Sequence, residues 1–176
     1  MATPTHPNMD QEVLTMGRIY YVPYTGTLTN AGGNSDLLEV LPTDDKPVKL
    51  RGMVLSQISE VGDAAEEGLQ ISVQRFPATV TGGSGGSAVT PTPTDSANTA
   101  AGAATECNNT TVATTNGTAV VFGYFGWNIR NSPFEFWWPD ADLAPKAKQG
   151  EALIVRCDTT PADDITINLM FVLEEE

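Results

Sequence analysis

The sequence holds a single histidine, the side chain that most often serves as a general base. His6 lies between Pro4 and Pro7, near the start of the chain. Serine or cysteine hydrolysis needs a histidine held rigidly against its nucleophile. Metal-dependent β-sandwich enzymes generally draw on several histidines. The sequence therefore predicts a protein without catalytic residues, and we expect neither a cofactor nor a metal site.

Pairs of carboxylates are the second group of side chains that could do chemistry. Asp140 and Asp142 carry oxygens of the kind that calcium prefers, and paired acids also serve glycosidases. However, no complete EF-hand pattern is present, and nothing in the sequence places two acids in one cleft. Asp is also favoured in turns, because its side chain bonds the nearby backbone. We interpret these residues as solvated turn residues.

A glycine-rich run and two cysteines complete the chemically suggestive features. Residues 82–87 (GGSGGS) resemble a phosphate-binding loop but lack its lysine and the following helix. Cys107 and Cys157 are too few for a disulfide framework. We expect a flexible loop and two free thiols, with one disulfide bridge as the alternative.

The charge balance limits the partners that the chain can bind. There are 22 acidic and 9 basic residues, which gives a formal net charge of −13. Nucleic-acid binding needs clustered Lys and Arg, and anionic lipid surfaces attract basic segments. We therefore expect neither nucleic acid nor membrane as a partner, whereas a basic patch on another protein remains compatible.

Short runs of β-branched and aromatic residues, separated by turn residues, predict an all-β fold. No long stretch repeats with the helical period. About eight antiparallel strands predict a β-sandwich, most simply a jelly roll, with another antiparallel sandwich or barrel as the alternative. Gly52 predicts a bulge or a close approach. The predicted strands lie at 18–22, 37–41, 48–58, 69–74, 119–129, 134–138, 151–157 and 165–173.

The chain length fits one domain. Residues 1–16 show no core pattern and are predicted to form an extended arm, followed by a single domain over 17–176. Within it, residues 77–117 consist mostly of Gly, Ser, Thr, Ala, Pro and Asn. Such a composition buries little apolar surface, so it predicts a long exposed loop. The acidic connection at 60–68 has room for one helical turn.

Aromatic residues are concentrated between positions 122 and 138. Trp137 and Trp138 are adjacent, so a regular strand would point them to opposite faces and leave one outside the core. Aromatic residues are enriched at subunit interfaces. The alternatives are the margin of the core beneath a loop and a platform for sugar rings. The candidate subunit-interface residues are Trp127, Phe136, Trp137 and Trp138.

The order of these segments resembles the small jelly-roll proteins that decorate the capsids of tailed bacteriophages. The resemblance spans 17–176 and lies in the pattern of strands and loops. It is carried by GRIYYVPY at 17–24, LEVLPTDD at 38–45, VLSQISEVGDAAEE at 54–67, the Gly/Ser/Thr-Pro insertion and the closing LEEE at 173–176.

The resemblance implies a non-enzymatic virion protein on the outer capsid surface, which clamps neighbouring major capsid protein subunits. It implies a homo-oligomer as well, with a trimer favoured. The first residues lack a basic region followed by an apolar run, so we expect synthesis in the host cytoplasm. The alternative function is a host-recognition or carbohydrate-binding module that resembles the head of a fibre.

Overall fold

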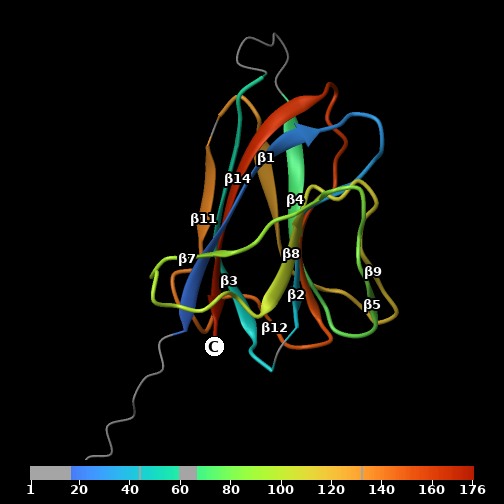
Figure 1. The fold of residues 1–176 in the computed structure, drawn as a ribbon. Coiled ribbons are helices and arrows are strands. Elements are labelled where there is room, and N and C mark those ends of the chain that lie inside the picture. The colour runs from blue at the N-terminus through green and yellow to red at the C-terminus, as the bar shows by residue number, and fades with distance from the viewer. Residues whose placement is uncertain (1–16, 44, 60–66, 132) are drawn as a thin grey trace, which may run out of the picture.

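The computed structural model describes residues 17–43, 45–59, 67–131 and 133–176, and every regular element in these ranges is a β-strand. The all-β class predicted from the sequence is confirmed. Two antiparallel sheets face each other in a sandwich-like arrangement, accompanied by a short two-stranded ribbon (Figure 1). Over the same ranges, no helix is long and apolar enough to cross a membrane.

Sheet A is built around the last long strand of the described chain. β14 (Ile165–Glu175) lies between β3 (Val48–Gln57) and β1 (Arg18–Leu28), and it pairs with β1 over eleven positions, from Arg18 opposite Glu175 to Leu28 opposite Ile165. β12 (Lys146–Ala147) pairs with β3 near the end of β11 (Phe134–Trp137). The order across the sheet is β11 (Phe134–Trp137), β3 (Val48–Gln57), β14 (Ile165–Glu175), β1 (Arg18–Leu28) and β7 (Thr92–Pro93).

Sheet B forms the opposite layer, and the ribbon lies outside it. The ribbon pairs β5 (Val80–Thr81) with β9 (Thr114–Thr115). The order across sheet B is β10 (Val120–Asn128), β4 (Gly68–Phe76), β13 (Ala152–Cys157), β2 (Ser35–Pro42), β8 (Ala103–Cys107) and β6 (Ser87–Ala88). Each stretch predicted to be extended overlaps one of the longer strands, and the pattern of β-branched and aromatic residues accounts for this agreement.

The core lies between the two sheets and follows the two-residue period of the strands. In β1, Tyr20 and Val22 point inward and are buried, whereas Tyr21 between them is 39% exposed. Phe171 of β14 and Trp127 of β10 are fully buried in the same cluster. Burying each such side chain contributes about 1.5–3 kcal/mol before the entropic cost of ordering it.

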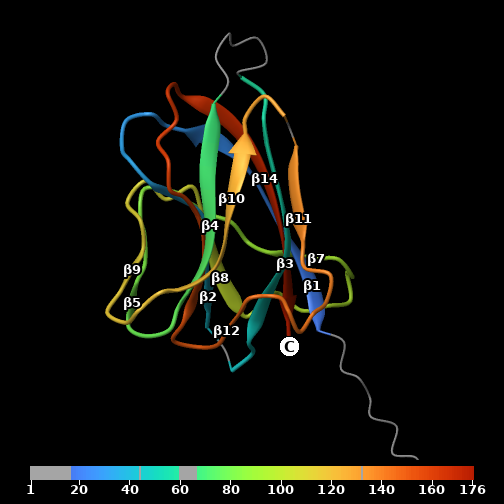
Figure 2. The ribbon, with the colours of Figure 1, turned by 180° about the vertical axis from the view of Figure 1, so that it is seen from behind.

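Aromatic rings close the margin of the sandwich where β10 and β11 face each other. The ring of Phe125 lies 5.9 Å from that of Phe134 and 4.7 Å from that of Phe136, measured between centroids. Figure 2 shows β10 and β11 together at this margin. β10 and β11 belong to different sheets and do not pair with each other. Packing of their tilted aromatic rings joins the two sheets at this margin instead.

The segment 77–117, predicted to be a long exposed loop, is mostly exposed over 77–100, but the segment also contains five short strands. It contributes β8 and β6 to sheet B, β7 to the edge of sheet A, and the ribbon β5–β9 (Figure 1). Backbone ladders need no apolar side chains, so a segment of small polar residues can extend a sheet that other strands have formed. Composition alone could not reveal this pairing.

A buried ion pair fixes the insertion to the outward face of sheet B. Arg156 of β13 donates to both carboxylate oxygens of Asp36 in β2, from Nε at 2.5 Å and from Nη2 at 3.1 Å. The side chain of Asp36 is fully buried, and that of Arg156 is 13% exposed. The same groups hold Ala113, whose amide donates to Asp36 at 2.6 Å and whose carbonyl accepts from Arg156 at 2.8 Å.

Glu39, three residues further along β2, holds a second part of the insertion. Its Oε2 accepts from the Gly83 amide at 2.8 Å and from Asn109 Nδ2 at 2.9 Å. Glu39 is 1% exposed, and its Oε1 has no hydrogen-bond partner among the described residues. Burial raises the pKa of this carboxyl above 4.5, and the nearby acids Asp36 and Glu106 raise it further.

A small second apolar cluster lies beneath the anchored insertion, on the outward face of sheet B. Phe76, Ile154 and Ala152 of the sheet pack with Ala113 of the insertion. The insertion therefore covers the part of sheet B around Phe76 and Ile154, whereas Tyr124 on β10 of the same sheet is exposed. The predicted arm at 1–16 and most of the connection at 60–68 lie outside the described residues.

We expect Arg156→Met to destabilise the fold by about 3–5 kcal/mol, because it leaves the Asp36 carboxylate buried without its partner. Lys146→Met is the matched control, since it breaks a more exposed ion pair with Glu176, and should cost about 1 kcal/mol or less. Urea unfolding of both variants measures the difference. Equal losses would contradict the anchoring role of Asp36 and Arg156.

The raised pKa of Glu39 predicts a pH dependence that Glu39→Gln removes. Because the folded-state pKa lies above the unfolded value, ionised Glu39 destabilises the fold at neutral pH, and protonation relieves this penalty as the pH falls toward 4.5. The wild type should therefore gain stability relative to Glu39→Gln as the pH falls. Urea unfolding over this pH range tests the trend, and a constant difference would contradict it.

Candidate interface on sheet A

The outward face of sheet A carries a row of apolar positions that crosses four strands. Tyr21 of β1 lies opposite Val172 of β14, Val172 lies opposite Gly52 of β3, and Gly52 lies opposite Trp137 of β11. We call these four residues the sheet A row. Both ends are open, because Tyr21 is 39% and Trp137 is 46% exposed.

Gly52 gives the Trp137 indole its position. A Cβ placed on Gly52 would collide with the indole ring, so the ring lies directly against the backbone of β3. The Trp138 amide donates to the Arg51 carbonyl at 3.1 Å and continues the ladder between the two segments. The close approach predicted at Gly52 is confirmed.

The neighbouring row extends this surface along the strands. Pro23, Met170 and Val54 lie opposite one another across β1, β14 and β3, and Glu135 ends the row on β11. A shallow depression of about 370 Å³ lies beside it on β1 and β14, lined by Pro23, Tyr24, Thr25, Asn168 and Leu169. Sheet A thus presents an apolar face that the described residues leave open.

A cluster of ion pairs stands at the end of β14, next to the sheet A row. Arg51 pairs with Glu174, while Lys49 and Lys146 both pair with Glu176. With Lys46 and Arg156, at least five of the nine basic residues are paired within the chain. Glu135 is exposed beside Trp137 and adds negative charge to this surface.

The four candidate interface residues are separated by the structure into three environments. Trp137 is exposed on the sheet A row. Phe136 and Trp138 are half-buried against the core, with their ring centroids 4.9 Å apart. The prediction that one of the adjacent tryptophans lies outside the core is confirmed, and it is Trp137.

Trp127 requires a correction, because it is fully buried between the sheets and pairs with Leu69 of β4. The indole of Trp127 fills the core and has no surface to offer a partner. Its neighbours in sequence alternate inward and outward along β10, and the pattern of aromatic residues did not indicate which set faced inward.

Tyr21 belongs to the surface, and Val172 lies in the same row but is only 5% exposed; neither was identified from the sequence. A signal was available for Tyr21, since adjacent Tyr20 and Tyr21 in one strand must face opposite sides, just as Trp137 and Trp138 do. Val172 has no such signal. Its place in the row follows from a register that joins distant parts of the chain.

The groups considered for chemistry form no second site among the described residues. No cluster of three or more His, Cys, Asp or Glu side chains is arranged there to hold a metal ion. Asp140 accepts a hydrogen bond from the Asp142 amide at 2.9 Å, as the turn interpretation predicts. Cys107 and Cys157 are free and buried, and burial raises their thiol pKa values to about 12 and about 11.

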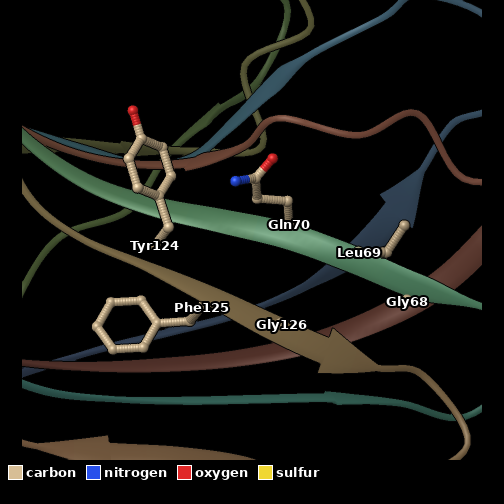
Figure 3. A pocket seen from close by; sticks show the side chains of 6 residues that line it. All are labelled: Gly68, Leu69, Gln70, Tyr124, Phe125 and Gly126. Carbon is tan, nitrogen blue, oxygen red and sulfur yellow. The ribbon is translucent and has the colours of Figure 1, made fainter.

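A shallow depression of about 380 Å³ lies on the outward face of sheet B where β4 and β10 meet. Figure 3 shows Tyr124 and Gln70 pointing to one side of the sheet and Phe125 to the other. Tyr124 is 63% exposed, and Gly68 and Gly126 leave space beside it. The depression has the open shape and the exposed ring that stacking on a sugar would require.

Comparison with known protein families, with curated proteins and with solved structures finds no match for this chain. Arguments about function therefore rest on the residues and their geometry.

Alanine substitutions should separate the core tryptophan from the surface tryptophan. Trp127→Ala opens a cavity in a packed core and should destabilise the fold by about 3–5 kcal/mol. Trp137→Ala removes a half-exposed ring and should cost about 1 kcal/mol or less. Urea unfolding followed by circular dichroism measures both, and a large loss for Trp137→Ala would mean that its ring is needed for the fold.

Proposed function

We propose that this chain is a non-enzymatic virion protein that decorates and stabilises the outside of a tailed-phage capsid. In this role it binds neighbouring major capsid protein subunits and holds them together. The proposal joins the resemblance of the sequence to capsid decoration proteins with the open apolar face of sheet A. That face, with exposed aromatic side chains at both ends of the sheet A row, is the observation that carries the proposal.

A jelly-roll fold forms part of the proposal. Eight strands are longer than three residues and lie outside the insertion. When these strands are numbered one to eight along the chain, their order across sheet A is 1-8-3-6, which corresponds to β1, β14, β3 and β11. Their order across sheet B is 2-7-4-5, which corresponds to β2, β13, β4 and β10. Two interlocked Greek keys produce this interleaving, which supports a jelly roll over other antiparallel sandwiches.

The sheet A row provides the contact with the capsid. Large exposed apolar groups that lie together commonly mark a protein-protein contact, and Tyr and Trp are the residues that most often dominate binding energy. Tyr21 and Trp137 supply such side chains at the two ends of the row. Val172 and the flat backbone at Gly52 lie between them.

The charged residues beside the sheet A row indicate which kind of partner surface would complement it. The exposed Glu135 borders the row, and the acidic turn at 140–142 follows β11. An apolar patch with a neutral or basic border on the major capsid protein would complement it. Repetition of this contact over a lattice, with the chain acting as a homo-oligomer, would strengthen attachment through avidity.

The double variant Tyr21→Lys with Trp137→Lys tests the proposal, because it places two charges on the contact surface. Purified wild type should cosediment with expanded, undecorated capsids and saturate at a fixed ratio to the major capsid subunit. The double variant should bind roughly tenfold or more weakly, as expected when central aromatic contacts are lost.

Ile58→Lys is the control, because Ile58 is 61% exposed directly after β3 and lies outside the row. This variant should bind as the wild type does. Absence of wild-type binding would refute decoration. Equal binding by the wild type and the double variant would retain decoration and remove sheet A as the contact surface.

The depression beside Tyr124 favours carbohydrate binding as a second candidate function. Exposed tyrosine rings stack on sugars, and Gln70 beside the ring could donate to a hydroxyl group. Binding of the isolated protein to a glycan array, lost in Tyr124→Ala, would support this function. A requirement for capsids would support decoration instead.

A further inference from the structure

The four sheet edges of the sandwich are protected to different degrees. Sheet A ends on one side in β7, which has two residues and includes Pro93, and on the other in the four-residue β11. Sheet B ends on one side in the two-residue β6. Short edge strands and proline are common means of preventing unwanted strand pairing. The remaining edge is β10, which is nine residues long.

β10 also lacks the charged side chains that usually protect an edge. Val120–Asn128 contains no Asp, Glu, Lys or Arg, although the chain carries a net charge of −13. Val121, Phe122 and Tyr124 are 39–63% exposed. A bulge between Val121 and Gly123 interrupts the beginning of the strand, and the register is regular from Gly123 to Asn128.

The regular part of β10 is held firmly on its inner side. Phe125 packs against the rings of β11, and Trp127 is buried in the core. On one side the strand pairs with β4, and no described residue pairs with its other side. A fixed strand of this kind presents a row of backbone donors and acceptors that fits another extended strand.

We infer that β10 pairs in antiparallel fashion with β10 of a second copy of this chain, so that two copies of sheet B form one continuous sheet. Two acidic chains repel each other over most of their surfaces. The uncharged edge allows their backbones to meet without like charges in contact. Pairing of identical strands is two-fold and closes on itself, so the building block is a dimer, where the resemblance implied a trimer.

Gly126→Lys tests the pairing on the isolated protein. A side chain at Gly126 meets no atom within 4 Å, so the monomer can accommodate it. Lysines from both copies would be brought together along the paired strands. Sedimentation equilibrium should give twice the 18.7 kDa chain mass for the wild type. The dissociation constant should rise roughly tenfold or more in Gly126→Lys, because like charges in a contact are costly.

Gly68→Lys is the matched control, since Gly68 is also open to solvent but lies on β4, away from the edge. It adds the same charge to the same face and should leave the dimer intact. Hydrogen exchange provides a second measurement. Amides within 123–128 should be protected in the wild type, and part of that protection should be lost in Gly126→Lys.

Three results would overturn the inference: a monomeric wild type at the highest soluble concentration, a trimer whose mass Gly126→Lys leaves unchanged, or equal dissociation by Gly126→Lys and Gly68→Lys. Capsids are absent from this experiment, and the contact does not involve the sheet A row. Failure of the dimer and failure of capsid decoration are therefore distinguishable.

Discussion

The buried ion pair between Asp36 and Arg156 keeps part of sheet B from contact with other molecules. It is bidentate and buried, and it holds Ala113 of the insertion through both backbone groups. With the insertion in place, the small apolar cluster around Ile154 is covered. The described residues leave Tyr21 and Trp137 of sheet A exposed. The two outward faces therefore differ, since the chain covers part of sheet B and leaves the sheet A row exposed at both ends.

Strand identity could be predicted from the sequence, because alternation and β-branched residues are local properties. The insertion could not. Its composition indicates little apolar burial, and this inference is sound, but its position depends on Asp36 and Glu39 inside an otherwise apolar strand and on backbone ladders. Such contacts join positions more than forty residues apart, as between Glu39 and Gly83. Burial of two acids in β2 gives no signal in composition or period.

The candidate surface was predictable to the same limited extent. Adjacency required Trp137 and Trp138 to face opposite sides, and the outward one is now identified. Trp127 was assigned to the wrong environment, because alternation along β10 gives two sets of residues without saying which set is inward. Tyr21 and Val172 join Trp137 only through the register of three strand pairs. Register depends on the whole sheet, and a shift of one residue would reverse every face.

The place of β14 has a consequence for how the protein is synthesised. β1 and β3 lie on either side of β14 in sheet A and do not pair with each other. Sheet A therefore cannot assemble on the ribosome until residues 165–175 have emerged. Before that point β1 and β3 have been synthesised but lack β14, the strand with which both pair. Pairing between distant parts of a chain is slow. Unpaired strand edges make such incomplete chains prone to aggregate, and the excess of negative charge on this chain opposes contact between them.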